Sequence, residues 1–278
     1  MQFGVHAALW MRTWHDDVAP YLDTAARLGF DSAELSLLAA DPEAAKRLRA
    51  RARELGLALT CTTGLAPGQD VTSDDPDVRA AGVAALRLAL RQTHALGAEL
   101  LSGVIYAPWG VRLAERRSER WARAAEALAA TAEEADDLGV TLGIEAINRY
   151  ETDLVNTAEQ AASLAEAVDH PRVGVLLDTY HLNIEEKDVR AALRRVGPRL
   201  VHLHVVENDR GVPGSGHVPW DDVRAGLRDI GYDRSVTLEM FVQAGLDVSP
   251  DLSVWRAIED HPTEAARAGL AFVRELLR

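Results

Sequence analysis

The sequence predicts an α/β barrel of eight parallel strands, each followed by a helix, in a single domain. Three observations carry this prediction. Short apolar runs rich in β-forming residues alternate with amphipathic runs of helical period from one end of the chain to the other. The apolar runs number eight, and the length of 278 residues is close to the roughly 250 residues typical of such barrels.

The expected strands are short, apolar and enriched in leucine, valine, isoleucine and threonine, which is the composition of a strand buried on both faces. They are Phe3–Leu9, Ser32–Leu37, Ala58–Thr63, Leu100–Ile105, Thr141–Ile147, Val173–Leu177, Leu200–Val206 and Val236–Phe241. Eight is the number of strands that one closed barrel requires.

The expected helices place alanine, leucine or valine at spacings of three and four, with arginine and acidic residues on the other face. They are Val18–Leu28, Pro42–Leu55, Asp77–Leu96, Ser118–Leu138, Ala158–Val168, Val189–Val196, Trp220–Ile230 and Thr263–Leu277. Several end at a Leu-Gly or Ile-Gly step, and glycine suits the left-handed residue that terminates a helix. Repeated strand–helix units imply parallel strands, because a right-handed helical crossover returns the chain to the same edge.

Two other architectures fit the length, namely two small domains and an open doubly wound sheet. The chain has no linker or low-complexity tract, so we expect one domain over residues 1–278. An early strand followed by a GxGxxG fingerprint would favour the open sheet, and no such fingerprint occurs.

Composition narrows the classes of partner. A formal net charge of -13 disfavours nucleic acid, because phosphate binding is driven by a surplus of lysine and arginine. No run of about 18 apolar residues predicts a membrane span, and the first residues lack the basic and apolar regions of a signal peptide. The single cysteine, Cys61, lies in an apolar run and is expected to be a buried structural thiol. These features favour a cytoplasmic protein.

Ionisable residues interrupt four of the last expected strands. Glu145 lies in TLGIEAI, Asp178 ends VGVLLD, His204 lies in LVHLHVV, and Glu239 lies in VTLEMF. Each has an ordinary structural explanation alone: a carboxylate can pair with arginine, Asp178 can cap the next turn, and a histidine can be hydrogen-bonded in the core. Together they place one such group near the same end of adjacent strands, which favours a common site.

Three carboxylates and one imidazole suit a hard or borderline divalent ion such as Mn²⁺, Mg²⁺ or Co²⁺, and a structural zinc site is disfavoured without cysteine ligands. Open coordination positions indicate Lewis-acid chemistry on a bound substrate. Because Glu145 and Glu239 approach the barrel centre from different sides, a flat substrate between them meets a carboxylate on each face. That arrangement suits removal of a proton from one face of a carbon and its return on the other.

With these residues in hand, the chain resembles the ketose 3-epimerases of the xylose-isomerase-like barrel superfamily. The motifs are the GxxYxxWG-like run over 103–110, GIEAINRYE, LLDTYHLNIEE, HLHVVENDRGVPGSGHVPW and VTLEMF. The resemblance implies that Glu145, Asp178, His204 and Glu239 bind the metal, with Mn²⁺ favoured over Co²⁺ or Mg²⁺, and that Glu145 and Glu239 are the acid/base pair. It implies that the sugar is held by Glu151, His181, Arg210 and Trp109.

The resemblance also implies a free ketohexose substrate and a homodimer or homotetramer, and it assigns no ligand role to His202. The first strand departs from the family pattern: His6, Ala7, Ala8 and Leu9 stand where aromatic or hydroxyl side chains often meet the far end of the sugar.

Several alternatives remain open at this point. They are an aldose–ketose isomerase, a sugar-phosphate 3-epimerase with phosphate in the Gly211–Gly216 loop, an enzyme that cleaves DNA at abasic sites, and a non-catalytic sugar-binding barrel. More metal-binding histidines and a basic face would be expected of the DNA enzyme, and the sequence shows neither.

Overall fold

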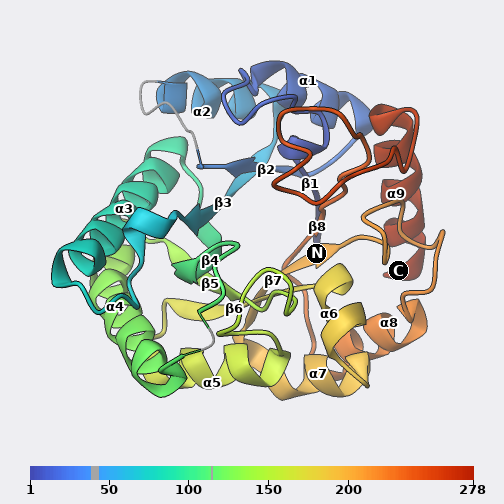
Figure 1. Cartoon of the computed structure of the whole chain (residues 1–278). Helices are drawn as coiled ribbons and strands as arrows, with labels where there is room; N and C mark the ends of the chain where they lie inside the picture. The colour runs from blue at the N-terminus through green and yellow to red at the C-terminus, as the bar shows by residue number, and fades with distance from the viewer. Residues whose placement is uncertain (39–43, 114) are drawn as a thin grey trace.

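The computed structural model describes residues 1–38, 44–113 and 115–278 and contains the predicted barrel. Eight strands form one closed sheet in sequence order, and every neighbouring pair is parallel, including the closing pair of the first and last strands. Helices surround this sheet as an outer ring (Figure 1). The fold prediction is therefore confirmed.

The strands are β1 Gln2–His6, β2 Ser32–Ser36, β3 Ala58–Leu65, β4 Leu100–Pro108, β5 Thr141–Glu145, β6 Val173–Asp178, β7 Leu200–Val205 and β8 Ser235–Leu238. Three of the predicted strands end two or three residues too late. The chain leaves the sheet after His6 in β1, after Glu145 in β5 and after Leu238 in β8. In β1 the cause is local: the His6 side chain accepts a hydrogen bond from the Ala8 backbone and begins a 3₁₀ turn, η1 Ala7–Leu9.

Within the described residues the helices are α1 Ala19–Leu28, α2 Ala44–Leu55, α3 Pro76–Leu96, α4 Arg117–Leu138, α5 Ala158–Val168, α6 Thr179–Glu185, α7 Val189–Val196, α8 Trp220–Asp229 and α9 Pro262–Leu276. Two further 3₁₀ turns are η2 Pro67–Gln69 and η3 Gly197–Arg199. The predicted start of the second helix at Pro42 lies outside the described residues. Glycines in the left-handed conformation end α1, α3 and α4 as expected.

Helix α6 was not predicted, because its seven residues are too few for a clear helical period. It begins directly after β6, and the Asp178 carboxylate accepts a hydrogen bond of 2.7 Å from the Tyr180 backbone N–H. Asp178 therefore does cap the next turn, as the ordinary explanation held. The cap uses only the Oδ1 atom of Asp178, so the Oδ2 atom can contact other side chains in the barrel interior.

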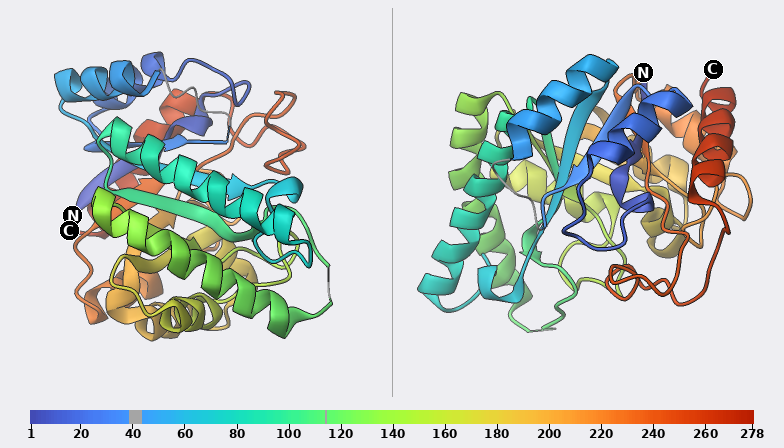
Figure 2. Two further views of the ribbon diagram at one scale, coloured as in Figure 1. Left: turned by 90° about the vertical axis from the view of Figure 1, so that its left-hand side faces the viewer. Right: turned by 90° about the horizontal axis from the view of Figure 1, so that it is seen from above.

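Parallel strands bring all their carboxyl ends to one mouth of the barrel. Both chain termini lie together at the opposite end (Figure 2). The long connections that follow β3, β4, β5, β7 and β8 gather at the carboxyl-terminal mouth, where barrels of this class build their sites. Among the described helices, none combines the length and the apolar character that crossing a bilayer requires.

Candidate active site

The four predicted metal-binding residues converge at the carboxyl ends of adjacent strands. Glu145 is the last residue of β5 and Asp178 the last of β6, while His204 lies one residue before the end of β7. Glu239 immediately follows β8. One ligand atom from each lies within 4.8 Å of the others, and all four side chains are buried.

The donor set fits a divalent cation. His204 Nδ1 lies 3.3 Å from Glu239 Oε1 and 3.8 Å from Glu145 Oε1, yet it is buried and has no aligned hydrogen-bond partner in the described structure. An orphaned buried nitrogen facing carboxylate oxygens is what a metal ligand requires. The groups that would hold the ion are the three carboxylates and this nitrogen.

Burial and mutual repulsion separate the acidities of these groups. Burial, reinforced by the charge of Glu239, raises the pKa of Glu145 well above its usual value. Burial raises the pKa of Asp178 to about 7, against the opposing charge of Arg210. Burial acts in the same direction on Glu239, but the neighbouring His204 and Arg210 outweigh it and lower the pKa of Glu239. Two carboxylates with opposite shifts are a pattern found in acid/base pairs.

Arg210 bridges the carboxylates from the loop after β7. Its Nη1 donates to Asp178 Oδ2 at 2.7 Å and to Glu239 Oε2 at 3.0 Å, and its guanidinium carbon lies 4.0 Å from the centre of the Tyr180 ring. The Arg210 side chain is buried, unlike an ordinary solvated arginine in a surface loop.

His181, on the first turn of α6, lines the cavity with the carboxylates, and its hydrogen bonds decide which ring nitrogen carries the hydrogen. Its Nδ1 accepts the Asn148 backbone N–H at 3.1 Å, so in the neutral ring Nε2 carries the hydrogen. Nε2 lies 4.0 Å from Glu145 Oε1. Burial lowers the pKa of His181 to about 4, more than the Glu151 carboxylate raises it, so the ring is neutral at pH 7.

Glu151 and Trp109 meet on the adjoining wall. The Trp109 indole N–H donates to Glu151 Oε2 at 3.0 Å, and the Asn148 side-chain amide donates to Oε1 at 2.7 Å. Both residues line one cavity together with Glu145, His181, Arg210 and Glu239. The sequence did not single out Asn148, although this residue lies within the GIEAINRYE motif on which the family resemblance rests.

Glu34 is the more important omission. It lies in the middle of β2, is fully buried, and its Oε1 lies 2.6 Å from His204 Nε2. Burial raises its pKa, but the adjacent His204 and His202 outweigh burial and hold the pKa of Glu34 well below its usual value. The signal was present, because an acidic residue interrupts the apolar SAELSLL run just as Glu145 interrupts its own strand.

A buried carboxylate also organises the glycine-rich loop that precedes α8. Glu207 accepts the backbone N–H groups of Gly214 and Val218, each at 2.8 Å, and the indole N–H of Trp220 at 3.0 Å. The His217 N–H donates to Asn208 at 3.2 Å. Within the Gly211–Gly216 loop, the amides of Gly211, Gly214 and Ser215 already donate to protein oxygens, so they are not free to bind a phosphate.

The remaining wall of the cavity comes from the first four strands and from the loops that follow β1, β2 and β8. His6, Ser36, Thr62 and Thr63 bring polar groups to it, and Trp14, Leu38, Phe241 and Leu252 bring apolar faces. His6 Nδ1 accepts the Ala8 N–H, so in the neutral ring Nε2 carries the hydrogen. Nε2 then donates to the Thr62 hydroxyl at 3.0 Å. The departure of this chain at its first strand therefore lies directly on the wall of the cavity.

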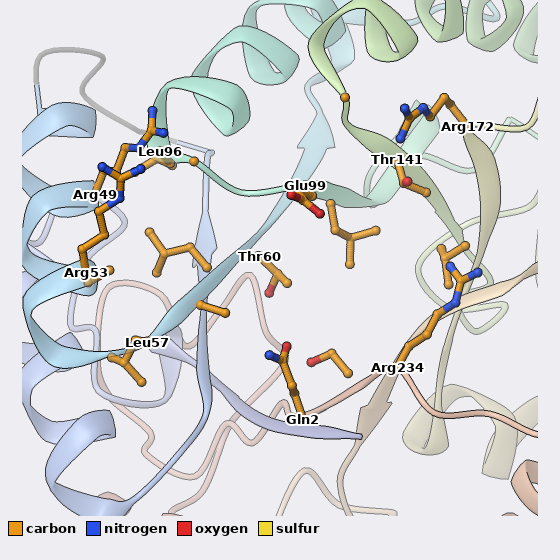
Figure 3. Close-up of a pocket in the computed structure, with 18 of the residues that line it drawn as sticks. Gln2, Arg49, Arg53, Leu57, Thr60, Leu96, Glu99, Thr141, Arg172 and Arg234 are labelled. Carbon is orange, nitrogen blue, oxygen red and sulfur yellow. The ribbon is translucent and has the colours of Figure 1, made fainter.

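A larger cavity, of about 540 Å³, lies at the amino-terminal mouth of the barrel (Figure 3). Arg49 and Arg53 approach it from α2, and Arg172 and Arg234 from the other side. The convergent carboxylates lie at the other mouth, and barrel enzymes place their chemistry there. Size alone therefore does not identify the active site of this barrel.

Comparisons with known proteins identify the family of the barrel. The family model "Xylose isomerase-like TIM barrel" matches residues 22–276. A D-psicose 3-epimerase of Ruminiclostridium cellulolyticum is 35% identical over 100% of this chain and 98% of its own, and a ketose 3-epimerase of Arthrobacter globiformis is 34% identical over 100% and 97%. The crystal structure of D-psicose 3-epimerase with D-tagatose from Clostridium cellulolyticum superposes with a TM-score of 0.95 at 35% identity, covering 100% of both chains.

Proposed function

Because the chain belongs to the xylose isomerase-like TIM-barrel family, and within it to the ketose 3-epimerases, we propose that it inverts C3 of free ketohexoses. The substrate pairs are of the D-tagatose/D-sorbose and D-fructose/D-psicose type, and the chain acts as one domain. Its relatives are isomerase-class enzymes that act on carbohydrates. The observation that carries the proposal is the convergence of Glu145 and Glu239 with Asp178 and His204 within 4.8 Å.

We propose that Glu145, Asp178, His204 and Glu239 bind a divalent ion, with Mn²⁺ preferred over Co²⁺ or Mg²⁺. Oxygen-rich sets with one imidazole suit these ions. When bound, the ion supplies Lewis-acid polarisation of the substrate carbonyl, which acidifies the hydrogen on C3.

The protein side chains supply the proton transfers. One of Glu145 and Glu239 removes the C3 proton, and the other delivers a proton to the opposite face of the resulting enediolate; the two exchange roles when the reaction runs in reverse. Positioned acid/base groups of this kind contribute factors of about 10² to 10⁴ in rate. A neutral His181 donates its Nε2 hydrogen to a substrate oxygen, and Arg210 donates from its guanidinium. Glu151 accepts a substrate hydroxyl, and Trp109 forms an apolar wall.

Two features support a free sugar over a sugar phosphate. Among the described residues that line the cavity, Arg210 is the one arginine, and Asp178 and Glu239 already share its charge. In the Gly211–Gly216 loop, which was the candidate phosphate site, the Gly214 amide donates to Glu207 and the Gly211 amide to Asp209. The hydroxyl groups of Ser36, Thr62 and Thr63 suit the neutral hydroxyls of an unmodified ketose instead.

The remaining proposals concern setting and assembly. We propose that the protein is cytoplasmic, in keeping with its single buried cysteine, and that it does not bind nucleic acid, in keeping with its net charge of -13. A homodimer or homotetramer is proposed from the family resemblance.

The deciding experiment is ¹H NMR in D₂O with Mn²⁺-loaded protein and D-fructose or D-tagatose. Deuterium is expected at C3 together with the C3 epimer, and both are expected to disappear in Glu145→Gln and Glu239→Gln. Glu186→Gln is the matched control, because Glu186 is a half-buried carboxylate that bonds the Ala158 N–H away from the site. Exchange at C1 with an aldose product would identify an isomerase instead. Unchanged exchange in both glutamine variants would exclude the two-carboxylate mechanism.

A further inference from the structure

Glu34 does not line the substrate cavity, and its carboxylate contacts His204, one of the four proposed metal-binding residues. Glu34 belongs to β2, whereas His204 belongs to β7, and the two residues are 170 positions apart in the chain. Both side chains are completely buried. A charged group that is withdrawn from water in this way persists only where its neighbours compensate it.

Glu34 determines which nitrogen of His204 is available to a metal. The carboxylate can only accept a hydrogen bond, so His204 Nε2, at 2.6 Å from Oε1, carries the hydrogen and donates it. In the neutral ring, Nδ1 then holds the lone pair and faces Glu145 and Glu239. A metal ligand needs that lone pair, and a carboxylate behind a ligating imidazole both orients the ring and strengthens it as a donor.

We propose that Glu34 is the positioning residue of this site: it holds His204 in the tautomer and orientation that bind the divalent ion. The proposal rests on the proposed metal site and adds to it a residue from the opposite half of the barrel.

One hydrogen bond and one close contact reach the second oxygen of Glu34. The Thr60 hydroxyl donates to Glu34 Oε2 at 2.8 Å, and His202 Nε2 lies 2.8 Å from the same oxygen without an aligned hydrogen bond. The His202 and His204 rings pack edge to face with their centres 5.0 Å apart, so each restricts the rotation of the other. Thr60 reaches Glu34 from the amino-terminal cavity (Figure 3), so a line of direct contacts runs from that cavity through Thr60, Glu34 and His204 to the proposed metal site. This contact also gives His202 a place in the structure, although it is not one of the four ligands.

A second metal ion is the competing explanation, because ligand atoms of Glu34, His202 and His204 also lie within 4.8 Å of one another. The separation of 2.6 Å between Glu34 and His204 is that of a direct charge-assisted hydrogen bond. An ion between these two atoms would need about 2 Å to each of them, so it could not fit on the line that joins them. The contact therefore favours a positioning role.

The test is the affinity of the purified full chain for Mn²⁺ and Co²⁺, measured by isothermal titration calorimetry without any sugar. Glu34→Gln keeps an oxygen that can accept from His204 but loses the charge, and Glu34→Ala loses both. We expect the Kd to rise about 10- to 100-fold in Glu34→Gln and further in Glu34→Ala. The visible spectrum of bound Co²⁺ is expected to change in both variants, because the imidazole is less well oriented.

Thr60→Val keeps the proposal testable if the Glu34 variants do not fold. It removes one hydrogen bond to Glu34 without touching any proposed ligand, and a smaller increase in Kd, of about 2- to 10-fold, is expected from a loss of roughly 0.5–1.5 kcal/mol. Thr131→Val is the control for the same substitution, because Thr131 is a buried hydroxyl that donates to Ala127 O within α4, away from Glu34. Its Kd is expected to equal that of the unmodified protein.

The outcomes separate the two proposals. If the unmodified chain binds one ion, and Glu34→Gln and Thr60→Val bind it as tightly as Thr131→Val does, Glu34 has no positioning role. A stoichiometry of two ions that falls to one in Glu34→Gln would replace the positioning role with a second metal site. If the unmodified chain binds no divalent ion, the proposed function itself fails, independently of Glu34.

Discussion

Arg210 Nη1 lies 2.7 Å from Asp178 Oδ2. A guanidinium from the loop after β7 therefore binds the carboxylate at the end of β6, at the carboxyl-terminal mouth of the barrel. The backbone of Arg210 has a φ of 71°, in the left-handed region that a non-glycine residue seldom adopts. The Phe241 N–H donates to the Arg210 carbonyl at 3.1 Å, which ties this loop to the chain beyond β8. Backbone strain held by surrounding contacts at a cluster of ionisable groups is typical of functional sites.

The first prediction concerns this guanidinium. Arg210→Lys is expected to lower kcat/KM for D-fructose or D-tagatose by about 100-fold or more, because a lysine cannot hold two carboxylates and a substrate oxygen in one plane. Arg256→Lys is the matched control, since Arg256 is 68% exposed and its ion pair with Asp209 is long, at 3.4 Å. Steady-state kinetics of both variants test this, and equal kcat/KM values for the two would contradict the role of Arg210.

The second prediction concerns metal removal. Treatment with EDTA is expected to abolish epimerisation, and Mn²⁺ is expected to restore it. An ion at 100 times its Kd stabilises the folded chain by about 2.7 kcal/mol, so thermal unfolding should occur at a higher temperature with Mn²⁺ than without. Asp178→Asn should lose most of that stabilisation. The same increase in both proteins would show that the ion binds elsewhere.

The third prediction concerns phosphorylated substrates. We expect kcat/KM for D-fructose to exceed that for D-fructose 6-phosphate by at least about tenfold, which corresponds to about 1.4 kcal/mol. The reason is that a phosphate would enter the cavity without a free cationic partner, and burying an unpaired charge is costly. Parallel assays at equal Mn²⁺ concentration check this. Preference for the phosphate would restore the sugar-phosphate 3-epimerase alternative.

The fourth prediction concerns stability. Arg120 is buried at the start of α4 and binds both oxygens of Asp153, at 2.7 and 2.9 Å, which fixes the segment that follows Glu151. Arg120→Ala is expected to cost about 3–5 kcal/mol of unfolding free energy, because it removes a buried guanidinium that binds both oxygens of the Asp153 carboxylate.

Arg47→Ala provides the comparison. Arg47 also pairs with an aspartate, Asp17, at 3.2 Å, but both side chains are more than half exposed, so the expected cost is below about 1 kcal/mol. Chemical denaturation of both variants measures the difference. Similar costs for the two would mean that burial does not determine the strength of the Arg120 pair.

The fifth prediction concerns Cys61, which is a free, buried thiol, as expected from its apolar run. Burial raises the pKa of this thiol from its usual value of 9.0 to about 12. The folded thiol should therefore react very slowly with iodoacetamide at pH 8.5 and rapidly once the chain is unfolded.

The same shift predicts a pH dependence of stability. Since the unfolded thiol loses its proton at lower pH than the folded one, the contribution of Cys61 to the free energy of unfolding is full below about pH 9 and is lost between about pH 9 and 12.

A comparison with Cys61→Ala tests the pH dependence, because the decline in stability over that range should become smaller in the variant. Rapid alkylation of the folded protein would show instead that Cys61 is exposed by local opening.

The sequence by itself determined the barrel and four members of its candidate site. Eight apolar runs separated by amphipathic helices leave parallel strands as the arrangement that buries both faces of the sheet. Once the strands are parallel, residues near their carboxyl ends must meet. This is why Glu145, Asp178, His204 and Glu239 were predicted together, and why their convergence needed no coordinates.

Tertiary structure alone decided what faces those residues from the other half of the barrel. Glu34 and His204 are 170 residues apart, and closing the sheet between β8 and β1 brings them to 2.6 Å. The loop amides that Glu207 accepts, the early end of β1 at His6 and the short helix α6 likewise depend on hydrogen bonds between side chains and backbone. Hydrophobic periodicity records which face of an element is buried, but it carries no information about which polar atom on that face meets which partner.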